Sequence, residues 1–129
     1  MSASAGPRHT TIALTAGGVT VLIDATTTGL PVVAYWGPAL PGLDREQAEA
    51  LLEAGIVVVG TNNIEPHPRV AVLPEHHTGW TGRPGLRGSY AGAGWSPAFV
   101  PTSVRVDGAA AGGFVATGPA TVAVDAACV

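Results

Sequence analysis

The stretch "HTTIALTAGGVTVLIDA" (residues 9–25) decides the fold class of this chain. Its apolar and polar residues alternate, many are β-branched, and Gly17 and Gly18 interrupt the pattern at its centre. Such alternation is typical of strands that bury one face, and paired glycines suit the tight turn of a hairpin. The stretch therefore predicts two antiparallel strands.

Strand-like segments continue outward from this hairpin. "LPVVAYW" (30–36) follows Gly29 and extends the hairpin into a meander, and further short runs occupy residues 56–59, 69–73, 99–108, 112–118 and 120–129. Many short strands with turn signals between them favour a sandwich or barrel. We expect an all-β fold of antiparallel strands.

One segment breaks the pattern. In "LDREQAEALLEAG" (43–55), Asp44 can cap a helix and Gln47, three residues later, can complete a capping box. Gly55 is a typical terminating residue. The segment predicts one short helix of about three turns.

The last run, "ATVAVDAACV", still alternates when the sequence stops at Val129. An apolar strand with an unpaired edge is an aggregation hazard. We therefore expect residues 1–129 to be a fragment, a partial sandwich domain truncated within a sheet.

Composition excludes several classes of partner. The chain has 129 residues, a net charge of −3 and six basic residues, all of them Arg and scattered. Nothing here favours nucleic acid or an anionic membrane as a partner. The single Cys128 cannot form an internal disulfide, and the sequence has neither a secretory signal nor a membrane-spanning run. We expect a cytoplasmic protein.

The sequence contains no complete active site. Glu75, His76 and His77 suggest metal ligands, but adjacent histidines point to different sides and no third ligand follows at a regular spacing. The acids outside the helix and the terminal hairpins are Asp24, Glu65 and Glu75, and their spacing does not pair them as glycoside hydrolysis requires. We expect no catalytic residues, no metal and no cofactor.

Residues 73–99, "LPEHHTGWTGRPGLRGSYAGAGWSPAF", gather two of the three Trp and six of the eighteen Gly. Trp rings can stack on the apolar faces of sugars, and Arg can donate to their hydroxyls. The candidate substrate-binding residues are Trp80, Arg83 and Trp95, with Trp80 and Arg83 exposed and Trp95 partly buried. The alternative is structural: glycine and proline make turns, and both Trp fill a weakly packed core.

"LPEHHTGWTGRPGLRGS" (73–89), followed by "GWSPAF" (94–99) and preceded by "AYWG" and a short helix, resembles the N-terminal region of glycoside hydrolase family 36 α-galactosidases of actinobacterial type. The resemblance implies an N-terminal β-supersandwich that packs against a (β/α)₈ barrel, with two catalytic Asp on that barrel and outside this sequence. It also implies an α-galactoside oligosaccharide as substrate and allows a homo-oligomer.

The resemblance has one departure. Better-studied members of the family carry a "DxRxP"-like stretch in this loop, and aligning its proline with Pro84 places Trp80 at the acidic position and Gly82 at the arginine position. The leading hypothesis is the non-catalytic sandwich portion of a retaining α-galactosidase, a hydrolase of carbohydrate metabolism. The alternatives are a stand-alone carbohydrate-binding or interaction module and a truncated product without function.

Overall fold

The computed structural model describes residues 10–25, 29–58, 60–62, 70–89, 91–94 and 96–129. Its elements, in chain order, are the strands β1 (Thr10–Ala16), β2 (Val19–Asp24) and β3 (Val32–Pro38), the helix α1 (Arg45–Ala54), the short 3₁₀ helix η1 (His76–Thr78), and the strands β4 (Phe99–Val106), β5 (Ala109–Ala110), β6 (Gly113–Thr117) and β7 (Val122–Cys128).

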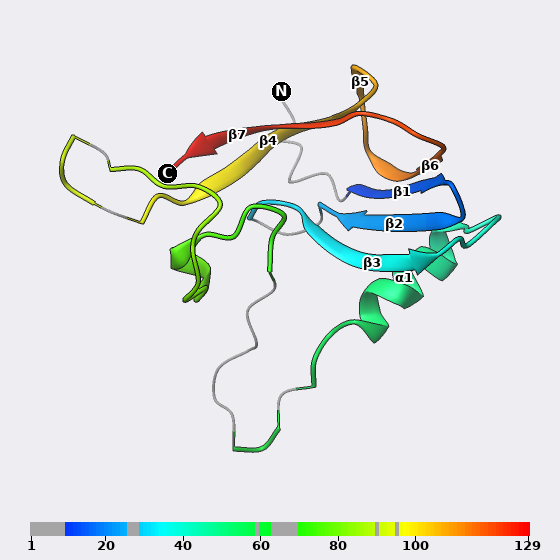
Figure 1. The fold of residues 1–129 in the computed structure, drawn as a ribbon, viewed down its shortest axis with the longest axis horizontal. Coiled ribbons are helices and arrows are strands. Elements are labelled where there is room, and N and C mark those ends of the chain that lie inside the picture. The colour runs from blue at the N-terminus through cyan, green and yellow to red at the C-terminus, as the bar shows by residue number, and fades with distance from the viewer. Residues whose placement is uncertain (1–9, 26–28, 59, 63–69, 90, 95) are drawn as a thin grey trace, which may run out of the picture.

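The strands form two sheets, so the chain has the expected all-β fold (Figure 1). In the first sheet the order is β3-β2-β1-β6, and in the second it is β5-β4-β7. The predicted meander is confirmed, because β1, β2 and β3 pair antiparallel in sequence order. The parallel pairing of β6 with β1 was not predicted. It joins segments about a hundred residues apart in the sequence. The alternation of residues within a strand shows which face is buried, but it does not show which distant strand will pair with it.

The core lies between the first sheet and α1. Ala13 of β1, Leu22 of β2 and Ala48 of α1 are buried together, and Tyr35 and Phe114 pack against them. Ile12 is also fully buried. Because successive strand residues point to opposite faces, Ile12 and Ala13 show that β1 is covered on both sides. The predicted helix is confirmed: Asp44 accepts from the Gln47 backbone N–H, and the Gln47 side chain accepts from the Asp44 N–H.

Two predicted strands are wrong. Residues 56–58 are exposed and outside any strand, and Val59 lies outside the described residues. In the 69–73 segment, Arg69 lies outside the described residues. Ala71 forms only an isolated bridge with Val32, next to a hydrogen bond from the Val72 N–H to the Pro31 carbonyl (2.8 Å). A strand exists only where its backbone groups find a partner strand, and β-branched composition does not supply one.

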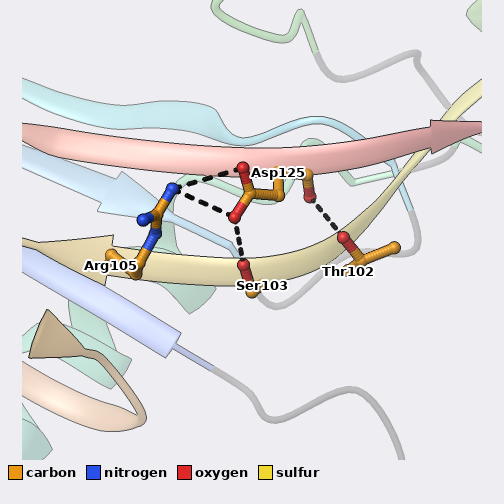
Figure 2. A network of polar contacts seen from close by, with 4 residues as sticks. All are labelled: Thr102, Ser103, Arg105 and Asp125. Carbon is orange, nitrogen blue, oxygen red and sulfur yellow. Dashed lines mark hydrogen bonds and ion pairs between the residues drawn. The ribbon is translucent and has the colours of Figure 1, made fainter. Parts of the chain in front are cut away.

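The second sheet carries a polar network on its exposed face (Figure 2). Pairing between β4 and β7 shifts register between Pro101 and Ser103, and the intervening Thr102 donates its hydroxyl to the Asp125 carbonyl (3.1 Å). The Asp125 carboxylate accepts from Ser103 (2.6 Å) and pairs with Arg105 (3.1 Å). The network therefore binds the two strands at the irregularity.

Candidate functional site

The loop of residues 73–89, which we call the Trp loop, is attached to the second sheet through Glu75. The Glu75 side chain is buried, with 1% of the residue exposed, and its Oε2 accepts from the backbone N–H of Phe99 at the start of β4 (3.0 Å). His77 Nδ1 lies 3.7 Å from the same oxygen. The other carboxylate oxygen, Glu75 Oε1, is buried and has no hydrogen-bond partner among the described residues. Burying a carboxylate costs free energy unless the carboxylate is hydrogen-bonded. The bond from the Phe99 N–H to Glu75 offsets part of this cost and holds one end of the Trp loop against β4.

Local hydrogen bonds shape the start of the Trp loop. The Thr78 hydroxyl donates to the Glu75 carbonyl (2.7 Å), and the Gly79 N–H donates to the His76 carbonyl (3.0 Å). Gly79 has φ +93°, a conformation that favours glycine and ends η1. The Gly85 N–H closes the loop by donating to the Pro74 carbonyl (2.8 Å). The backbone therefore turns back on itself and leaves the sheet.

Trp80 packs on its own turn. Its indole Nε1–H donates to the Arg83 carbonyl (3.1 Å), and its ring covers Gly82 so closely that a Cβ there would lie 2.9 Å from ring atoms. The side chain is half-buried, so the expectation of an exposed Trp80 is met only in part. His76 Nε2 lies 3.3 Å from the Gly82 carbonyl and donates to it in the tautomer protonated at Nε2. The turn is thus closed by contacts among its own residues.

The other two predicted binding residues have different outcomes. Arg83 is exposed, as expected, and its side chain makes no hydrogen bond or ion pair with any part of the chain that the structure describes. Trp95 lies outside the described residues. Trp80 and Arg83 are therefore joined through one backbone carbonyl, while the place of Trp95 stays a prediction.

Two adjoining hollows, which we call the groove, are lined by residues of the Trp loop and of the segments that follow it. The first, about 450 Å³, is lined mainly by His76, Pro84, Arg87, Ser89, Ser96 and Pro97. The second, about 570 Å³, shares Arg87, Ser89 and Ser96 with the first. It extends to Phe99 at the start of β4, to Cys128 at the end of β7 and to Val129, the last residue of the sequence. Neither Trp80 nor Arg83 is among the described residues that line them.

Sequence reasoning missed the residues of the groove. Arg87 and His76 lie in the stretch that composition singled out, but nothing in their spacing distinguishes Arg87 from Arg83. Ser89 and Ser96 are ordinary loop residues, which only the path of the backbone brings together. The only feature of the sequence that pointed to the groove residues was the number of polar side chains between residues 73 and 99.

The described residues can be searched for a group of metal ligands, for the acids considered above and for a helix that could span a membrane. Within these residues, no three His, Cys, Asp or Glu side chains gather in a way that could hold a metal ion. Glu65, one of the acids weighed for catalysis, lies outside them, whereas Asp24 is buried in β2. No helix in the described ranges is long and apolar enough to cross a membrane.

Comparison of the chain with protein-family models, curated proteins and solved structures finds no match. The geometry of the Trp loop and the groove, together with the motifs of residues 73–99, is therefore the basis for assigning a function.

Proposed function

We propose that this chain is the non-catalytic β-sandwich portion of an α-galactosidase-like hydrolase, in which the Trp loop contributes to binding of a terminal α-galactoside. The parent enzyme removes this sugar by double displacement in the cytoplasm, using two Asp of a (β/α)₈ barrel. The observation that carries the proposal is the Trp loop itself: it is fastened to β4 through Glu75 and presents Arg83 outward.

Arg83 supplies the chemistry that a sugar needs. A guanidinium has five N–H donors in a planar fork and no acceptor atom. None of those donors is used by the described residues, so they are available to sugar hydroxyls. The Trp80 ring, held by its bond to the Arg83 carbonyl, fixes the backbone from which this side chain projects.

Trp80 acts as a rigid support with one remaining stacking surface. Its ring lies against Gly82 on one side, and its partial exposure leaves part of the ring for the C–H face of a sugar. Ordering the loop before the ligand arrives lowers the entropy lost on binding. This arrangement supports a preorganised binding loop.

A stand-alone carbohydrate-binding module is the second candidate. It is favoured by the groove, because described residues of this chain alone line both hollows. Such a module would bind sugar without a barrel. The two candidates differ in whether the chain needs another domain to hold the ligand.

Binding of methyl α-galactoside to the 129-residue chain, followed by NMR, tests the assignment. In the leading proposal, the isolated chain binds weakly and has no turnover of a nitrophenyl α-galactoside, because both catalytic carboxylates belong to the barrel. Arg83→Gln and Trp80→Ala abolish the residual binding, whereas Arg45→Gln on α1 does not. Turnover lost on Asp24→Ala or Glu75→Ala would contradict the proposal.

The downstream reading frame separates the two candidates. A frame that continues past Val129 into a (β/α)₈ barrel with Asp at strand ends supports the hydrolase. A stop codon at that point, combined with millimolar or tighter galactoside binding by the chain, supports the stand-alone module.

A further inference from the structure

Arg87 lies at the junction of the two hollows and has no charged partner among the residues that the structure describes. It lines both of them, is exposed, and makes no hydrogen bond or ion pair within the described parts of the chain. The other described arginines outside the Trp loop behave differently: Arg45 pairs with Glu49 (2.9 Å) and Arg105 with Asp125 (3.1 Å). Arg87 therefore presents to the groove a guanidinium that is paired with no Asp or Glu side chain of the described residues.

The polar residues that line the first hollow beside Arg87, among those that the structure describes, include no acid. His76, Ser89 and Ser96 supply a ring nitrogen and two hydroxyls, and none of the described lining residues is Asp or Glu. The nearest acid in sequence, Glu75, is buried outside the lining and accepts from the Phe99 N–H. The described lining of the first hollow therefore combines a positive charge with hydroxyl groups and includes no carboxylate side chain.

The size and the apolar part of the lining favour a small organic ligand. The first hollow, about 450 Å³, falls within the usual range for small-molecule sites, roughly 300–1,000 Å³. Pro84, Leu86 and Pro97 provide flat or aliphatic surfaces beside the polar groups. A sugar ring has such a mixture of C–H faces and hydroxyls, whereas an inorganic anion would use only the polar groups.

From this combination we propose that the groove binds a carboxylate-bearing sugar, a uronic acid, whose carboxylate is held by Arg87. The guanidinium fork matches a carboxylate in a bidentate geometry. Ser89 and Ser96 exchange hydrogen bonds with ring hydroxyls, and the prolines contact the C–H face. The site is separate from the galactoside-binding face of the Trp loop, since neither Trp80 nor Arg83 lines it.

The two proposals fail in distinguishable ways. Galactoside binding is assigned to Arg83 and Trp80, and uronic acid binding is assigned to Arg87. A chain that binds galacturonate but no methyl galactoside refutes the first assignment and retains the second. The converse result refutes the second alone.

The experiment titrates galacturonate, galactose and inorganic phosphate separately into the 129-residue chain, with affinities from NMR or calorimetry at fixed salt. Galacturonate should bind at least about tenfold more tightly than galactose, as expected for one charge-assisted pair. Arg87→Gln should remove that preference, and Arg87→Lys should restore only part of it because it lacks the planar fork. The charge-matched control Arg45→Gln should leave the preference unchanged.

Three outcomes would overturn the proposal. Equal affinity for galacturonate and galactose removes the role of the carboxylate. A preference for galacturonate over galactose that survives Arg87→Gln would show that another residue binds the carboxylate. Phosphate binding as tight as galacturonate and lost in the same variant indicates a simple anion site without sugar recognition. Amide NMR spectra check that each variant is folded. If Arg87→Gln is unfolded, the galacturonate preference of Arg87→Lys, which keeps the charge, is compared with that of the wild type instead.

Discussion

At the scale of single residues, Glu75 decides where the Trp loop leaves the sheet. Its carboxylate spans 24 residues of sequence to reach the Phe99 N–H, and it is buried while its neighbours His76 and His77 are exposed. A residue that composition suggested as a metal ligand or an acid is thus a structural anchor.

Removing this anchor should destabilise the fold. Glu75→Ala leaves the partly buried Phe99 N–H without its acceptor and opens a cavity at the buried Glu75 side chain, so we expect a loss of roughly 2–4 kcal/mol in the free energy of unfolding. Glu75→Gln keeps an acceptor oxygen and should cost less. Urea unfolding of both variants measures the difference, and an alanine variant as stable as the wild type would show that the contact does not hold the loop.

Gly82 should be intolerant of a side chain because of Trp80. A Cβ at Gly82 would lie 2.9 Å from the indole, whereas one at Gly88 would meet nothing within 4 Å. Gly82→Ala should displace the Trp80 ring and cost about 1–3 kcal/mol, with a shifted Trp80 indole N–H signal in NMR spectra. Gly88→Ala is the matched control and should change stability by less than about 0.5 kcal/mol. Similar behaviour of the two variants would argue against the packed turn.

At the scale of elements, the cap of α1 is the clearest local device. Asp44 Oδ1 accepts from the Gln47 N–H (2.8 Å), and Gln47 Oε1 accepts from the Asp44 N–H (3.1 Å). The sequence pattern alone predicted both partners, because a capping box depends only on residues three apart. The helix then buries Ala48 against the first sheet, so its cap also supports the core.

Asp44→Ala should therefore cost about 1 kcal/mol of stability. Asp44→Ser, which retains a capping oxygen, should stay close to the wild type. Thermal unfolding monitored by circular dichroism measures both, and equal losses in the two variants would mean that the side-chain cap contributes nothing.

At the scale of the whole molecule, large apolar side chains remain on the surface. Trp36 of β3 is 75% exposed, and Ile56 and Val58 after α1 are 64% and 88% exposed. Exposed apolar surface of this kind promotes association. The homo-oligomer implied by the family resemblance stays a prediction.

We expect the 129-residue chain to associate with increasing concentration, and Trp36→Thr to reduce association with little effect on stability because the ring is mostly in solvent. Sedimentation velocity over a hundredfold concentration range provides the measurement. A monodisperse monomer with one sharp, cooperative melt would contradict this expectation.

Local patterns in the sequence were sufficient for the elements whose causes are local. The alternation of residues 9–25 with Gly17 and Gly18 at the centre predicted the first hairpin, and the spacing of Asp44 and Gln47 predicted the start of α1. Composition likewise indicated that residues 73–99 contain the candidate site. These features depend on neighbours within a few positions along the chain.

Only the tertiary structure decided which segments meet. Residues 56–58 have the composition of a strand but pair with no strand among the described residues, whereas β6 pairs with β1, which lies about a hundred residues earlier in the chain. The same holds at the site: Glu75 reaches Phe99, and Arg87 lines the groove with Ser96 while Arg83 does not. Backbone pairing and loop closure between distant residues depend on the whole fold, because the partner of each hydrogen-bonding group is set in space rather than by sequence spacing.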